Sequence, residues 1–183
     1  SAGLETAGKI TTVVLDKTGT ITTGQMSLLE MVLIDNPLTT DSTAISASDL
    51  LSFILSVECM DSHPIATAIS KSLAKQGVAI FPVSEFEQTP GVGIAARVQS
   101  PAGSKAVLIG SPISIARSTT EFSPKLLTAI EDGKRRGNSV SVLALDGLAY
   151  GVFEVGDEIK PEGKAAVSSL QATGLNTWLV TGD

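Results

Sequence analysis

The sequence predicts an α/β protein in which an antiparallel sheet flanked by helical hairpins is inserted into a partial doubly wound domain. Short apolar strands near the two ends of the chain, at residues 9–15 and 177–180, predict a parallel sheet. Asp16 follows the first of them and opens a loop of Lys, Thr and Gly, as is typical of the carboxyl edge of an open α/β sheet. The long segment between these ends has a different periodicity and is large enough to be a domain.

The expected boundaries follow from these changes of periodicity. We expect a discontinuous outer domain and an inserted domain, with bounds of 1–24 and 156–183 for the first and 25–155 for the second.

The first half of the insert predicts a strand and a helical hairpin. Residues 25–34 read as a strand and residues 35–43 as a loop. Residues 50–57 are apolar on every side, which suits a buried helix. A second helix is expected at 64–76, with Pro64 at its first position and Gly77 as its stop.

The second half of the insert has a shorter periodicity, typical of antiparallel strands. Asp146-Gly147 is a favoured two-residue hairpin turn. The expected elements are strands at 83–88, 94–98, 105–109, 140–145 and 148–155, and a helix through Leu126, Leu127 and Ile130 that ends near Gly137. After the insert, a helix at 161–173 is expected to turn Ala166, Val167 and Leu170 to one face and to end at Gly174.

The composition excludes several classes of protein. With 183 residues, 43% hydrophobic and 17% charged, the chain can bury a sizeable core. The net charge of -6 argues against a nucleic-acid surface, and Lys134-Arg135-Arg136 reads as a helix end. The single Cys59 rules out an internal disulfide. Because no apolar stretch approaches the roughly 20 residues of a spanning helix, we expect a soluble fragment that does not itself contact a membrane.

The loop after Asp16 suits a nucleophile that accepts a phosphoryl group. Lys17, the hydroxyls of Thr18 and Thr20 and the amides around Gly19 could neutralise the incoming charge. Soluble aspartyl-phosphate phosphatases usually carry an acid two places after the nucleophile, where this chain has Thr18. Thr cannot act as a general acid near neutral pH, so the pattern favours a phosphoenzyme that persists.

The string Asp16-Lys17-Thr18-Gly19-Thr20 resembles the phosphorylated loop of the P-type ATPases. Asp157-Glu158-Ile159-Lys160-Pro161-Glu162 and Thr181-Gly182-Asp183 are similar to two later motifs of that family, in the same order. The resemblance implies a haloacid-dehalogenase-like phosphorylation domain. It also implies that Asp16, Lys17, Thr18, Thr181, Gly182 and Asp183 are catalytic, and that Asp16 and Thr18 form an incomplete Mg²⁺ site.

The insert resembles the nucleotide-binding domain of the heavy-metal class of that family. Ser62-His63-Pro64-Ile65-Ala66 is similar to its His-Pro motif, and Glu58 lies where that class places an acid that contacts adenine. The resemblance implies ATP binding by Glu58, His63, Gly91, Gly93, Gly110 and Ser111. Taken alone, His63 could simply cap a helix, and Gly91 and Gly93 could form a tight turn. The family commonly has Asn where this chain has Ser111, which puts that contact in doubt.

The resemblance implies the cytosolic ATP-binding and phosphorylation portion of an integral membrane pump that transports a heavy-metal cation, with Cu⁺ expected. The expected cofactors are ATP and Mg²⁺, and the expected partners are the remaining phosphorylation, actuator and transmembrane domains, without nucleic acid. The fragment alone is expected to bind ATP without turnover, and its remnant around Asp16 and Asp183 to be only partly native. A Zn²⁺, Cd²⁺ or Co²⁺ pump, a soluble phosphatase with a large cap and a purely ATP-binding module stay open as alternatives.

Overall fold

A computed structural model describes residues 10–35, 44–119 and 121–180 of the chain. Residues 36–43 of the expected loop lie outside this range. The chain divides into two compact units, one of Met26–Gly156 and one of Ser1–Gln25 together with Asp157–Asp183. The mixed α/β class with a large antiparallel sheet is confirmed.

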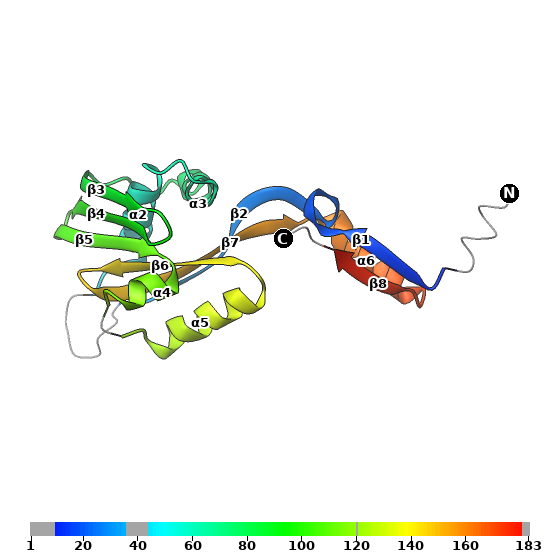
Figure 1. Cartoon of the computed structure of the whole chain (residues 1–183). Coiled ribbons are helices and arrows are strands. Elements are labelled where there is room, and N and C mark those ends of the chain that lie inside the picture. Colours follow the sequence, from blue (N-terminus) through cyan, green and yellow to red (C-terminus); the bar gives the residue numbers. More distant parts are fainter. Residues whose placement is uncertain (1–9, 36–43, 120, 181–183) are drawn as a thin grey trace. The chain divides into compact units, whose positions relative to one another are not determined.

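The larger unit is built on a six-stranded sheet with the order β2-β7-β6-β5-β4-β3 (Figure 1). Neighbouring strands from β3 to β7 are antiparallel. The strands are β2 (Thr22–Leu33), β3 (Val83–Thr89), β4 (Gly93–Ser100), β5 (Gly103–Gly110), β6 (Ser139–Leu145) and β7 (Leu148–Ile159).

Helices cover both faces of this sheet, because its central strands are apolar on both sides. In β6, Leu143 and Leu145 pack in one core with α2 and α3, whereas Val142 and Ala144 pack in a second core with α4 and α5. Figure 1 shows the two helix pairs on opposite sides of the strands. The helices are α2 (Ala47–Glu58), α3 (Pro64–Lys75), α4 (Pro112–Ala116) and α5 (Pro124–Arg135).

Most of the expected elements of the insert are confirmed, with one addition. The helix α4 was not expected, because its five residues are too few to show a helical period. Its sequence nevertheless carries a helix start, since Ser111 accepts a hydrogen bond from the Ser114 amide and Pro112 occupies the first turn.

The hairpin between β6 and β7 turns at Asp146-Gly147 as expected. Both residues have positive φ angles, 47° and 82°, as a two-residue turn of this kind requires. The Asp146 carboxylate also accepts hydrogen bonds from Lys105 Nζ (2.8 Å) and the Ala106 amide (2.9 Å), which attach the turn to β5. Burial by itself would raise the pKa of Asp146, but these contacts outweigh it and the pKa is lowered.

A glycine inside α5 marks its closest approach to the sheet. A Cβ on Gly133 would lie 2.7 Å from Val140 Cγ2 and 2.8 Å from Glu154 Cδ. Glu154 is held by Arg136 (2.5 Å) and Asn138 (2.9 Å), so it cannot swing away freely. We therefore expect Gly133→Ala to lower the free energy of unfolding by about 1–3 kcal/mol in urea denaturation.

The matched control for this variant is the exposed position 131 of the same helix. There, Glu131→Ala should be more stable than Glu131→Gly by roughly 1 kcal/mol, the ordinary helix preference. A Gly133→Ala chain that is more stable than the wild type would contradict the close packing.

The smaller unit contains a two-stranded parallel sheet and a helix that packs beside it. In the described residues, β1 (Thr12–Asp16) pairs with β8 (Asn176–Val180), and α6 (Pro161–Ala172) precedes β8. Gly174 ends α6 with a φ of 79°. Val167 and Leu170 are partly buried as expected, but the placement of Ala166 on their face was wrong, because Ala166 is exposed and Gly163 is the buried residue. A Cβ on Gly163 would lie 2.5 Å from the Ile21 carbonyl, so α6 packs directly on the loop backbone.

Candidate functional site

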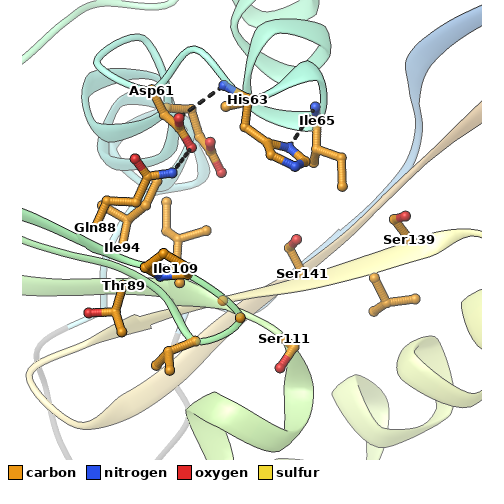
Figure 2. Close-up of a pocket in the computed structure, with 18 residues that line it drawn as sticks. Asp61, His63, Ile65, Gln88, Thr89, Ile94, Ile109, Ser111, Ser139 and Ser141 are labelled. Carbon is orange, nitrogen blue, oxygen red and sulfur yellow. Dashed lines mark hydrogen bonds between the residues drawn. The ribbon is translucent and has the colours of Figure 1, made fainter.

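A cavity of about 620 Å³ opens in the larger unit, between the corner that joins α2 to α3 and the ends of β3, β4 and β5 (Figure 2). Its volume is in the range of small-molecule sites. All six residues that the sequence pointed to in the insert line it: Glu58, His63, Gly91, Gly93, Gly110 and Ser111. The structure therefore brings together residues that are far apart in the chain, although their roles stay predictions.

Glu58 is the buried acid of the cavity. It ends α2 with only 3% of its surface exposed. Burial raises the pKa of Glu58 to about 7, and the negative charge of Asp61 adds to the increase. Near neutral pH this side chain is therefore present in both forms, and the neutral form can donate one hydrogen bond and accept another.

His63 both caps α3 and lines the cavity. Its Nδ1 accepts a hydrogen bond from the Ile65 amide at 3.3 Å, at the N-terminus of the helix that Pro64 begins. The capping interpretation is thus confirmed without removing His63 from the site. Because Nδ1 accepts this bond, it carries no proton in this arrangement, and the proton of the neutral ring is on Nε2.

The cavity also contains residues that no sequence motif pointed to. Asp61 and Gln88 form a hydrogen bond across it, and Ser139 and Ser141 line it from β6. The serines reach the cavity only because β6 pairs with β5, with Val142 opposite Gly110. No local motif marks them, whereas Asp61 could have been noticed as an acid two positions before His63.

Glycine is required at these positions of the cavity for different structural reasons. Gly93 and Gly110 face each other across β4 and β5, and a Cβ on Gly93 would overlap the Ile109 carbonyl oxygen. A Cβ on Gly110 would overlap the Val92 carbonyl oxygen in the same way. Gly91 instead has a φ of 74° in the turn, with open space where a Cβ would point. The turn interpretation is therefore confirmed for Gly91, and the pair at 93 and 110 lets two backbones approach.

Ser111 uses its hydroxyl at the start of α4. Its Oγ accepts from the Ser114 amide at 3.2 Å and lies 2.8 Å from Ser114 Oγ. A ligand contact at Ser111 would therefore share this oxygen with the helix cap.

The second candidate site lies in the smaller unit, at the carboxyl end of β1. Asp16 is the last residue of this strand, opposite Val180 of β8. The turn Lys17–Ile21 follows at once, and its Gly19 has a φ of 77°. The Asp16 carboxylate accepts a hydrogen bond from Thr20 Oγ1 at 3.4 Å, and the residue is exposed, as an attacking group must be.

Residues after the insert hold this turn and the start of β2 in place. Asp157 accepts hydrogen bonds from the Gly24 amide (2.9 Å) and the hydroxyls of Thr22 and Thr23. Lys160 donates from Nζ to the Gly19 carbonyl (2.6 Å) and from its amide to the Ile21 carbonyl (2.9 Å). The motif that begins at Asp157 therefore positions the loop that follows Asp16.

The remaining candidates at Thr181, Gly182 and Asp183 lie outside the described residues. Within residues 10–35, 44–119 and 121–180, no group of three or more His, Cys, Asp and Glu could hold a metal ion. In the same ranges, every helix is too short or too polar to cross a membrane.

A match to a protein family shows which family the chain belongs to. Residues 10–183 match the haloacid dehalogenase-like hydrolases. The chain belongs to this family. The Asp16 loop and the parallel strands thus belong to a haloacid dehalogenase-like hydrolase, as the sequence predicted.

Relatives of this haloacid dehalogenase-like chain include metal pumps. It is 32% identical over 171 residues to "Copper-transporting ATPase 1" of Rhizobium meliloti (strain 1021), covering 93% of this chain and 19% of that protein. It is also 32% identical over 180 residues to "Copper-exporting P-type ATPase" of Bacillus subtilis (strain 168), covering 98% and 21%. These relatives confirm the resemblance seen in the motifs.

A solved structure of similar fold is that of a zinc-transporting PIB-type ATPase in the E2.Pi state. It has a TM-score of 0.73 and 27% sequence identity, and the match covers 100% of this chain and 27% of the other. The haloacid dehalogenase-like chain thus spans about a fifth of the length of the two curated relatives.

Proposed function

We propose that the chain is the ATP-binding and phosphorylation portion of a P-type ATPase that transports a heavy-metal cation, with Cu⁺ as the transported ion. The observation that carries this proposal is the cavity of Met26–Gly156, which gathers Glu58, His63, Gly91 and Gly93. The names of the two copper-transporting relatives support the ion, and the zinc-transporting structure keeps Zn²⁺ as the second candidate.

The chemistry of Glu58 suits adenine. In its neutral form the carboxyl group accepts from one neighbour and donates to another. Adenine offers a matching pair on one edge, with the N6 amine as donor and N7 as acceptor, whereas guanine offers two acceptors there. The buried Glu58 therefore favours ATP over GTP.

In the proposed reaction, an oxygen of the Asp16 carboxylate attacks the γ-phosphorus of ATP, and the bond to the β-phosphate oxygen breaks as ADP leaves. The amides around Gly19 and the ammonium of Lys17 stabilise the charge on the transferred group. The bonds of Asp157 and Lys160 keep this loop in position. Water then hydrolyses the aspartyl phosphate. Because position 18 holds Thr rather than an acidic residue, this second step is slow enough to be coupled to transport.

The described residues offer only part of a magnesium site. Asp16 and Thr18 supply oxygen ligands of the kind that Mg²⁺ prefers, and the other positions of its octahedral shell would be filled by water and phosphate oxygens. When bound, Mg²⁺ would supply positive charge that offsets the charge of the phosphates.

Calorimetric titration of the chain with ATP tests the nucleotide assignment. We expect Glu58→Ala and His63→Ala each to weaken ATP binding roughly tenfold, since each removes a polar contact. The exposed Glu87→Ala, on β3, serves as the control and should bind like the wild type. Unchanged affinity in both cavity variants would refute the assignment.

Phosphorylation by labelled ATP in the full-length protein tests the role of Asp16. Asp16→Asn should abolish the acid-stable phosphoenzyme. A phosphoenzyme that persists in this variant would remove Asp16 from the mechanism.

The transported ion is tested in the same full-length protein. Stimulation of its ATPase activity by Cu⁺ rather than Zn²⁺ would identify Cu⁺ as the transported ion.

A further inference from the structure

Asp61 occupies a bridging position in the cavity, and the sequence motifs described above do not include it. It lies in the loop between α2 and α3 and is half-buried. One carboxylate oxygen, Oδ1, accepts a hydrogen bond from the backbone amide of His63 at 2.9 Å. The other, Oδ2, accepts from the side-chain amide of Gln88 at 3.0 Å. A single carboxylate thus contacts two walls of the cavity.

Gln88 connects this carboxylate to the glycine turn. It lies in β3 opposite Ile94 of β4, directly before the turn that contains Gly91 and ends at Gly93. Figure 2 shows Asp61 between the backbone of His63 and the side chain of Gln88, with both bonds as dashed lines. The bond joins segments that are 27 positions apart in the sequence.

We propose that Asp61 and Gln88 form a clamp that fixes the glycine turn against the His63 wall and so sets the width of the nucleotide cavity. The proposal rests on the ATP binding proposed above and assigns the two residues as positioning residues. Because Asp61 also fixes the backbone of His63, the clamp holds the imidazole and the glycine turn in fixed positions relative to each other.

The geometry predicts how charge at the two positions should act. Gln88→Glu places two carboxylates where an amide now donates to a carboxylate, so the walls repel each other. Asp61→Asn in that background restores a donor and an acceptor with the polarity reversed. Asp61→Asn alone is tolerated, because the Gln88 amide can rotate and accept from the new amide group, while the carbonyl oxygen of that group still accepts from the His63 backbone.

The test is ATP titration calorimetry on the whole chain with these three variants. We expect Gln88→Glu to weaken binding roughly tenfold, and Asp61→Asn with Gln88→Glu to return it to within about twofold of Asp61→Asn alone. Gln99→Glu is the matched control, because it places the same charge on the exposed far end of β4. The amide signals of Gly91 and Gly93 in NMR spectra should shift in Gln88→Glu and return in the double variant.

Recovery of ATP affinity in the double variant distinguishes a positioning role from a general loss of stability, since a variant that merely loosens the fold is not repaired by a second substitution. If Gln88→Glu binds ATP like the wild type, or the double variant binds no better than Gln88→Glu, the clamp is refuted even though Glu58 and His63 variants still lose affinity. If the wild-type chain itself fails to bind ATP, the proposed function falls, and the clamp falls with it.

Discussion

Replacing Gly93 by Ala is expected to destabilise the larger unit by roughly 3 kcal/mol or more and to abolish the proposed ATP binding. The added Cβ would overlap the Ile109 carbonyl oxygen and lie 2.7 Å from the Cα of Gly110. These are backbone atoms of a paired strand, so they cannot move without breaking the ladder between β4 and β5. The φ of 140° adds strain for any residue with a side chain. Urea denaturation measures the loss of stability.

Two other glycines of the same unit provide controls for Gly93→Ala. Gly103 has a φ of 114° and Gly91 a φ of 74°, and at neither position would an added Cβ have an atom within 4 Å. Alanine at these two positions has the conformational strain without the steric clash, so each substitution should lower the free energy of unfolding by about 1–2 kcal/mol. Equal losses at all three positions would show that the close approach at Gly93 does not matter.

Replacing Glu58 by Gln is expected to make the chain more stable than the wild type at pH 8 and to remove a pH dependence. The pKa of Glu58 is about 7 in the folded chain, against an ordinary value of 4.5. Between these values the unfolded chain loses the proton and the folded chain keeps it, so the free energy of unfolding falls as pH rises. The loss is complete above about pH 7 and amounts to about 3 kcal/mol.

The measurement is urea denaturation of both proteins from acid to mildly alkaline pH. The stability difference between Glu58→Gln and the wild type should grow from the ordinary pKa of 4.5 to about 7 and then level off. Any hydrogen bond that Gln changes contributes a constant offset and does not affect this slope. Glu87→Gln removes an exposed carboxylate as a control. A pH-independent difference would show that Glu58 titrates alike in both states.

Local sequence predicted most elements of the insert, because each has its own start or stop signal. Pro64 begins α3, Gly77 follows it with a φ of 71°, and Asp146-Gly147 turns the last hairpin. The errors came where such signals were weak or misleading. The short helix α4 has no period to detect, and Ala166 was placed on a buried face although α6 packs through Gly163.

The candidate site was predictable only where residues carry a local motif. Glu58, His63 and Gly91 could be picked out in this way, and they line one cavity. Ser139 and Ser141 could not, because strand pairing alone brings them there. The raised pKa of Glu58 is also a tertiary property, since the packing around the end of α2 removes water from it.

The hydrogen bonds between Asp157 and residues 22–24, at the start of β2, imply an order of assembly during synthesis on the ribosome. Asp157 and Thr22 are 135 positions apart, and the inserted unit occupies almost all of that distance. The segment that carries Asp16 is translated first but gains its anchors only after Lys160 has emerged. The inserted unit, whose sheet is complete in Met26–Gly156 apart from the ends of β2 and β7, can therefore fold before the loop that follows Asp16 is held in place.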